Sequence, residues 1–184
     1  LEFRLVLFRS PDKDFGWDKG LSNAVNHGYH DVWLEIIPQS VWQYCAAVGN
    51  PFELGEFNQG AAVLDLGCGA GVDLCVASLL VGNEGRVSGV DVTPAMVELA
   101  RRNATLAGLS NVTVHQASIE ALPFDDGCFD FVISNGAVNL SESKEKVFAE
   151  VFRVLSAGGH LYFADMIKGE NHLAEACCSS ESWA

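Results

Sequence analysis

The stretch "VLDLGCGAG", Val63–Gly71, decides how the rest of the sequence is interpreted. It is an apolar segment that contains one acid and then runs into three glycines. A buried strand followed by a glycine-rich turn is typical of sites that hold a nucleotide or a nucleoside. The spacing here is G-x-G-x-G, whereas the dinucleotide-binding turn has the spacing G-x-G-x-x-G. The stretch therefore predicts a nucleoside-containing ligand, and its neighbours indicate which one.

Two acids near the turn narrow the choice of ligand. Asp65 stands just before the first glycine, and Asp91 ends the next predicted strand. A carboxylate beside the turn repels a pyrophosphate but suits a ligand that carries positive charge. S-adenosylmethionine (SAM) has a sulfonium and an ammonium group and no phosphate, so Asp65 favours SAM over NAD. Asp91 can accept hydrogen bonds from ribose hydroxyls, which both ligands have.

Strand and helix patterns alternate from Ala61 onward. Apolar runs predict strands, and apolar residues at helical spacing between glycine ends predict helices. Thr93 and Pro94 stand at the start of one helix, as N-cap and first helical residue, and Gly108 ends it. The predicted strands are 62–67, 86–91, 111–117, 129–135 and 160–167, and the predicted helices are 72–82, 93–109 and 141–159.

Strands that alternate with helices of this length predict an α/β fold. We expect a doubly wound, Rossmann-like, mostly parallel sheet with helices on both faces. In the last helix, Val147, Phe148, Val151 and Leu155 are expected to face inward.

The N-terminal third has a different pattern. Residues 1–59 are interpreted as an extension with a helical cap, and residues 60–184 as the Rossmann-like domain. Within the extension, a helix is expected to begin at Pro38, to run through Val48 and to end at Gly49. Trp33, Trp42 and Tyr44 lie there at helical spacing, where aromatic side chains are more often core than pocket lining.

Composition excludes several partners. The chain has 184 residues with 24 acids and 11 bases, which gives a formal charge of −13. Such a surface disfavours nucleic acid, and no apolar run approaches the roughly 20 residues of a membrane span. With no signal peptide recognised, we expect a cytoplasmic protein. The six cysteines are scattered without metal-site spacing, so we expect free thiols and no bound metal.

Four segments carry a family resemblance. They are "VLDLGCGAG", "VSGVDVTPAMVELARRNA", "ASIEALPFDDGCFDFVISN" and "EVFRVLSAGGHLYFADM". Together they resemble the class I SAM-dependent methyltransferases over roughly residues 60–167. Further stretches, "AAVGNPFELGEFNQG" and "VISNGAVNLSESKEKVFAEVFRVL", are similar to the arsenite methyltransferases and their relatives.

The resemblance implies a SAM site, whose product form holds S-adenosylhomocysteine (SAH). Ser118 stands where the family usually has an acid, and a serine can also accept a hydrogen bond from the adenine amine. By position, the expected contacts are Asp65, Gly67, Cys68, Gly69 and Gly71 for the methionine portion, Asp91 for the ribose, Ser118 and Ile119 for the adenine, and Ser134 and Asn135 beside the methyl group. Val92, next to Asp91, is also expected to contact the cofactor.

The methyl acceptor is expected to be a small molecule, and the sequence does not identify it. Gly136 occupies the position where the arsenite methyltransferases have a cysteine, and their second substrate cysteine has no counterpart before the final "SESWA". Because arsenic is thiophilic, this argues against arsenite held in that family's manner. Alternatives are a quinone-type carbon or oxygen methyltransferase and a degenerate SAM-binding domain without catalysis. An NAD oxidoreductase is disfavoured by Asp65 and by the glycine spacing.

No side chain stands out as a catalytic base. Methyl transfer from a sulfonium needs mainly alignment and the exclusion of water. The histidines, including His115 and His160, are interpreted as ordinary polar side chains. Asn139 is a candidate to orient the acceptor or to cap the helix expected near Ser141.

Five strands are predicted, whereas sheets of the resembled family usually have seven. The chain therefore looks like a fragment, or like a form that completes its sheet with another copy. The segment "LYFADMI" would be an apolar edge that favours a homo-oligomer. The opening "LEFRLVLF" alternates well enough to be a strand that covers this edge.

Overall fold

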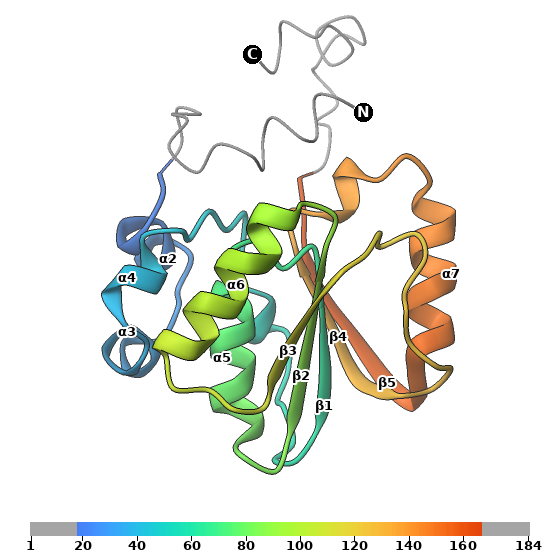
Figure 1. Cartoon of the computed structure of the whole chain (residues 1–184), viewed down its shortest axis with the longest axis horizontal. Helices are drawn as coiled ribbons and strands as arrows, with labels where there is room; N and C mark the ends of the chain where they lie inside the picture. The colour runs from blue at the N-terminus through green and yellow to red at the C-terminus, as the bar shows by residue number, and fades with distance from the viewer. Residues whose placement is uncertain (1–17, 167–184) are drawn as a thin grey trace, which may run out of the picture.

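The computed structural model describes residues 18–166, and its centre is a five-stranded parallel sheet (Figure 1). The strands run in the order β3-β2-β1-β4-β5. Their bounds are β1 Ala62–Leu66, β2 Arg86–Asp91, β3 Val112–Gln116, β4 Phe129–Asn135 and β5 Leu155–Ala164. The predicted doubly wound α/β fold is confirmed.

The strand β1 is central because it pairs in parallel with both β2 and β4. In register, Asp65 lies opposite Gly89 of β2 and Ile133 of β4. The chain moves outward from β1 to β3 in one direction and then returns to β4 on the other side. The order in which successive strands are added to the sheet therefore reverses between β1 and β4. Ligands of open α/β sheets bind at the carboxyl ends of the strands beside such a reversal.

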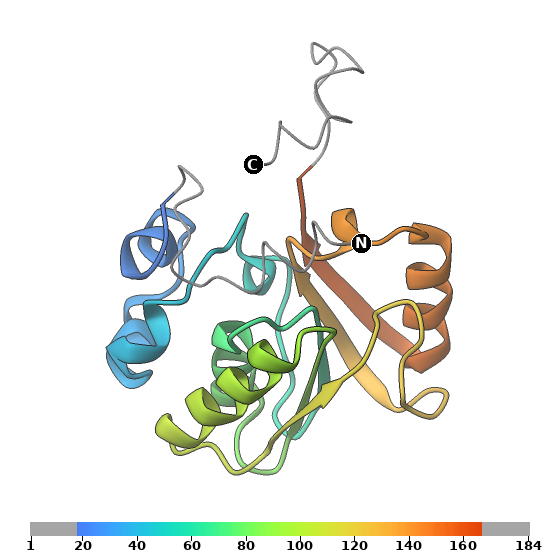
Figure 2. The same cartoon turned by 45° about the horizontal axis from the view of Figure 1, so that its top comes forward.

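Two helical layers cover the sheet, as Figures 1 and 2 show. On one face lie α5 (Val72–Val81) and α6 (Pro94–Leu106), and on the other lies α7 (Lys144–Val154). Successive side chains of a strand point to opposite faces of the sheet. Val63 therefore packs in the cluster with α5, and Leu64 packs in the cluster with α7. This alternation places Asp65 on the same face as Val63.

Local capping explains where two helices begin. Thr93 and Pro94 are the N-cap and first residue of α6, as predicted, although the Thr93 side chain makes no capping hydrogen bond. The helix α7 begins later than expected, because its N-cap is Ser143, whose hydroxyl accepts from the Lys146 amide. The alternative in which Asn139 caps this helix is therefore wrong.

The end of α7 also differs from the prediction. The helix stops at Val154, and β5 begins at once with Leu155, so the "SAGG" segment is strand. These residues lie where the register of β5 against β4 shifts, since Phe129 pairs with Leu155 and Phe131 pairs with His160. Val147, Val151 and Val154 form the buried side of α7, whereas Phe148 is 41% exposed and meets the ring of Phe163. The expectation that Phe148 faces inward is wrong. Leu155 packs against the cluster on the α7 side as expected, but as the first residue of β5 and not as part of the helix.

The N-terminal extension consists of short helices that pack on the α5 side of the sheet. They are α2 (Leu21–Asn26), α3 (Asp31–Ile36), α4 (Gln39–Trp42) and the 3-10 turn η1 (Pro51–Glu53). The predicted helix from Pro38 to Val48 is wrong beyond α4. The Asn23 side chain accepts from the amide of Ala47 and donates to its carbonyl, so these groups are withdrawn from helical bonding.

The aromatic residues of this extension are mainly core. Trp42 is fully buried, and Trp33 packs edge to face against the buried ring of Tyr29. In the sheet, His160 lies within β5 rather than at its start, and it stacks on Phe131.

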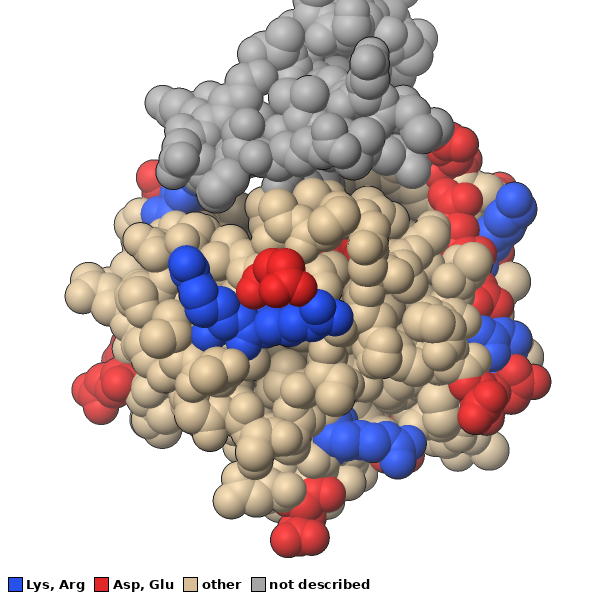
Figure 3. All heavy atoms as spheres, in the orientation of Figure 1, with Lys and Arg blue, Asp and Glu red and all other residues tan. Residues whose placement is uncertain are grey.

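Surface properties bear on several expectations. On the face drawn in Figure 3, basic side chains stand in small groups beside acidic ones. Among residues 18–166, no helix has the length and apolar character that crossing a membrane would need. Within this part of the chain β5 is a sheet edge. The prediction that residues 1–8 cover that edge falls outside the described residues.

The burial pattern of α7 gives a test with adjacent residues. Val151 is 3% exposed and Phe152 is 84% exposed. Val151→Ala is expected to lower the free energy of unfolding by about 2 kcal/mol, because it leaves a cavity under the helix. Phe152→Ala should change it by less than about 0.5 kcal/mol. Urea unfolding of both variants measures the difference, and equal losses would contradict this packing.

Candidate functional site

The glycine turn lies at the carboxyl end of β1 and leads into α5. Gly67, Gly69 and Gly71 all have positive φ angles, of 70°, 51° and 83°. A side chain at Gly67 would strike Ala137, and one at Gly71 would lie 3.0 Å from the Cβ of Ala100. At Gly69, by contrast, an added Cβ meets no atom of the described residues within 4 Å. Two glycines thus permit close packing, and Gly69 faces open space where a ligand can approach.

Asp65 is the most unusual group of the site. Its side chain is 2% exposed, and its Oδ2 has no hydrogen-bond partner within residues 18–166. Burial raises its pKa well above the usual value, and the charges of Asp73 and Asp91 raise it further. A buried carboxylate oxygen without a partner costs free energy, so it is an expected contact for a cationic ligand group.

Asp91, at the end of β2, is held by the backbone around the turn. Its Oδ2 accepts from the Gly69 amide at 3.0 Å, and its Oδ1 accepts from the Thr93 amide at 2.8 Å. A carboxylate has about four lone-pair positions, so acceptor capacity remains for further donors such as hydroxyls. The next residue, Val92, is 47% exposed, and so it offers an apolar surface beside this acid.

The other predicted contacts lie at the same ends of the strands, but several already have partners. The Ser134 hydroxyl is buried and donates to the Leu66 carbonyl. The Ser118 hydroxyl, just beyond β3, accepts from the Glu120 amide in a local turn. Ile119 is half-buried and packs against the cluster on the α7 side. Cys68, which lies within the turn, is buried.

Asn135, at the end of β4, is bound to the N-terminal extension. Its Oδ1 accepts from the Val48 amide at 3.0 Å, and its Nδ2 donates toward the Gly49 carbonyl at 3.0 Å. The same Nδ2 lies 3.1 Å from Asp73 Oδ2 and 3.1 Å from the Tyr29 hydroxyl. Sequence reasoning missed Asp73 and Tyr29. The signal for Asp73 was a single acid among the apolar residues of "VDLCV", at the start of a predicted helix.

Three buried carboxylates, Asp65, Asp73 and Asp91, therefore gather on one side of the sheet. None of them forms an ion pair with a Lys, Arg or His in the part of the chain that the structure describes. Burial raises the pKa of all three, and for Asp73 the hydrogen bonds from Tyr29 and Asn135 act in the opposite direction. This electrostatic arrangement suits a ligand that brings positive charge.

The thiols of the described residues do not form a comparable site. Cys45, Cys68 and Cys75 are free and buried, and burial raises the pKa of Cys45 and Cys75 to about 12. No three His, Cys, Asp or Glu side chains between residues 18 and 166 are arranged as a metal site. Gly136 has a φ of 70°, a conformation that a side chain rarely adopts. Cys177 and Cys178 lie outside the described residues.

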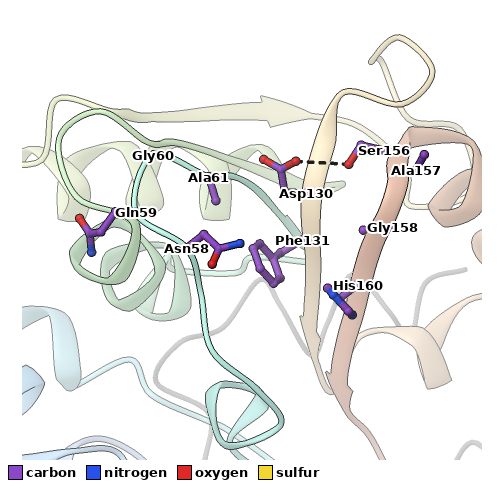
Figure 4. A pocket seen from close by; sticks show the side chains of 11 residues that line it. Asn58, Gln59, Gly60, Ala61, Asp130, Phe131, Ser156, Ala157, Gly158 and His160 are labelled. Carbon is purple, nitrogen blue, oxygen red and sulfur yellow. Dashed lines mark hydrogen bonds between the residues drawn. The ribbon is translucent and has the colours of Figure 1, made fainter.

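A hollow of about 320 Å³ lies at the end of the sheet opposite to the glycine turn (Figure 4). It is lined by the segment before β1 and by the early parts of β4 and β5. In it the Ser156 hydroxyl donates to Asp130 at 3.2 Å. Because it lies at the amino ends of the strands, it is separate from the glycine turn.

A parallel sheet with a glycine turn after β1 and an acid at the end of β2 is common to domains that bind NAD and SAM, and the G-x-G-x-G spacing and the buried Asp65 match the class I SAM-dependent methyltransferases. Comparison with known proteins agrees. A family model described as "Methyltransferase domain" matches residues 57–184. The chain belongs to this family.

The similar proteins include arsenite methyltransferases and a quinone C-methyltransferase. The chain is 41% identical over 120 residues to an arsenite methyltransferase of Halobacterium salinarum, covering 65% of this chain and 31% of the relative. It is 33% identical over 150 residues to a ubiquinone/menaquinone biosynthesis C-methyltransferase of Yersinia pestis, covering 80% and 54%. A crystal structure of an arsenic(III) SAM methyltransferase from Chlamydomonas reinhardtii matches with 42% identity and a TM-score of 0.67, covering 73% of this chain and 47% of that one. The chain spans about a third to a half of the length of these proteins.

The buried carboxylates make stability depend on pH in a defined direction. Because the pKa of Asp65 is raised in the folded state, the folded protein holds this proton more tightly than the unfolded chain does. Asp65 therefore lowers stability as pH rises above about 4, which is the pKa of an aspartate side chain in an unfolded chain. Asp65→Asn removes this penalty. Its free energy of unfolding relative to wild type is expected to increase with pH, as measured by urea unfolding in a series of buffers.

Other groups titrate in the opposite direction, such as Glu150, whose pKa is lowered to about 2 by Arg153. The difference between the two proteins cancels these contributions, because both proteins share them. A difference that does not vary with pH would contradict an unpaired, buried Asp65.

Proposed function

We propose that this chain is the SAM-binding part of an enzyme that transfers a methyl group to a small molecule. The observation that carries the proposal is the buried Asp65 oxygen, which has no partner among residues 18–166, beside a turn that is open at Gly69. A carboxylate in that position matches the α-ammonium group of SAM. The sulfonium supplies a second positive charge near Asp65, Asp73 and Asp91.

Each remaining part of the cofactor has a counterpart in the predicted set. Asp91 has acceptor capacity for the ribose hydroxyls, and exposed Val92 offers an apolar surface to the adenine. Ser118 and Ile119 are proposed to border the adenine edge, and the amides of the turn to face the methionine portion. When bound, SAM supplies an activated methyl group. The residues then need to hold the donor in line with the acceptor and to exclude water.

For the acceptor, the relatives support two chemistries. Arsenite methyltransferases share 41% identity with this chain, but three of the described thiols, Cys45, Cys68 and Cys75, are buried, and burial raises the pKa of each. Such thiols are poor ligands for arsenite, because the thiolate is the binding form. A quinone-type acceptor is the second candidate, supported by the 33% identity to the Yersinia C-methyltransferase over 150 residues.

The open space at Gly69 gives a test of the ligand position with a matched control. Gly69 and Gly108 both have positive φ, and at either position an added Cβ meets nothing within 4 Å in the part of the chain that the structure describes. Alanine at either position should cost about 1–2 kcal/mol of stability, because it strains the backbone. Only Gly69→Ala places a methyl group in the proposed ligand space. It is expected to weaken SAH binding about tenfold, equivalent to about 1.4 kcal/mol, while Gly108→Ala leaves binding unchanged.

Calorimetric titration of the chain with SAH tests the proposed function itself. Binding that is lost in Asp91→Ala and kept in Asp125→Ala, an exposed acid on the loop before β4, supports a cofactor site at the carboxyl ends of β1 and β2. Folded protein that does not bind SAH contradicts the proposal and favours the degenerate domain. With binding established, transfer from labelled SAM to arsenite with glutathione, and to a hydroquinone, distinguishes the two acceptors.

A further inference from the structure

Tyr29, Asp73 and Asn135 form a buried polar cluster that the proposed function does not explain, and we call it the latch. Asp73 Oδ1 accepts from the Tyr29 hydroxyl at 2.7 Å, and Asp73 Oδ2 accepts from Asn135 Nδ2 at 3.1 Å. Both carboxylate oxygens are thus held by neutral donors. The three residues come from the N-terminal extension, from the first turn of α5 and from the end of β4.

The latch fixes the extension at two places. Asn135 holds the backbone of Val48 and Gly49 through its Oδ1 and Nδ2. Tyr29 is itself set by edge-to-face contacts with the rings of Trp42 and Phe52. Movement of Tyr29 therefore costs Asp73 a hydrogen bond, and movement of Val48 and Gly49 costs Asn135 two.

Fold stability alone does not account for this cluster. A buried carboxylate that only neutral donors hold costs more free energy than apolar side chains of similar volume would. Asp73 forms no ion pair with any residue between 18 and 166 that would offset this cost. A costly charge at this position is consistent with a role in ligand binding.

The position of the latch indicates which part of a ligand it serves. In the strand order β2-β1-β4, Asp91 ends β2, Asp65 lies at the end of β1, and Asn135 ends β4. A ligand whose ribose lies at Asp91 and whose ammonium lies at Asp65 points toward Asn135. Asp73 in the first turn of α5 and Asp65 of β1 lie on the same face of the sheet, and the charge of Asp73 helps to raise the pKa of Asp65.

We propose that Tyr29 and Asp73 are positioning residues, which orient Asn135 so that the Val48–Gly49 segment closes over the amino-acid end of the cofactor. The inference rests on the proposed function, because it needs SAM at the glycine turn. It assigns to the N-terminal extension a share in cofactor recognition. The latch would favour ligands that carry the amino-acid group over nucleosides that lack it.

Two ligands that differ only in this group test the latch. SAH carries the amino-acid group, and 5′-methylthioadenosine keeps the adenosine and the sulfur without it. In Tyr29→Phe, which removes one hydroxyl and keeps the ring, SAH should bind about tenfold more weakly, while methylthioadenosine changes by less than about twofold. Asp73→Asn, whose side chain has one acceptor oxygen instead of two, should show the same selectivity.

Tyr44→Phe is the matched control. It makes the same chemical change in the same extension, and no hydrogen bond of the Tyr44 hydroxyl is found within the described part of the chain. It should leave the affinity for both ligands unchanged. If Tyr29→Phe weakens both ligands equally, or neither, the latch is only structural and the inference is overturned.

A measurement on the wild-type chain removes the dependence on variants that fold poorly. Hydrogen exchange at the Val48 amide, which Asn135 holds, should slow when SAH is added and should respond little to methylthioadenosine. Equal protection by both ligands overturns the inference and leaves the proposed function intact. A folded wild type that binds neither ligand overturns both.

Discussion

The structure depends on the parallel pairing of β1 with β2 on one side and with β4 on the other. This pairing buries Asp65 between two neighbours and brings the ends of three strands together at one glycine turn. The acids at these ends come from separate parts of the chain, and the register alone makes them neighbours. Their shared negative charge is a consequence of the pairing, and it is the property that a cationic cofactor would use.

Much of the fold could be predicted because its signals are local. The limits of β2 and β4 match the predicted segments, since buried strands form apolar runs that end at turns. Helix ends were less predictable. The segment after α4 is not helical because Asn23, far away in sequence, binds the backbone of Ala47. Phe148 fits the helical period of α7 but lies beyond the edge of its buried face.

The candidate site also contains residues that the sequence predicts and residues that only the structure reveals. Asp65, Asp91 and the glycines were found from the sequence because their spacing follows from one strand, one turn and one helix. Asn135 was found through the family resemblance, yet its side chain holds the extension in this structure. Tyr29 gave no local signal, because its role arises from a contact with Asp73, 44 residues later. Side chains that act across such separations need the tertiary structure to be recognised.

The long separation of the latch residues also affects how the chain folds. Tyr29 and Asn135 are 106 positions apart, so their contact closes a long loop that must wait until β4 has joined the sheet. The β1–α5–β2 unit, by contrast, forms from contacts between near neighbours in sequence. We expect the N-terminal extension to dock late in folding and to detach first in partial unfolding. A nascent chain would then present an assembled glycine turn before the segment that covers it is in place.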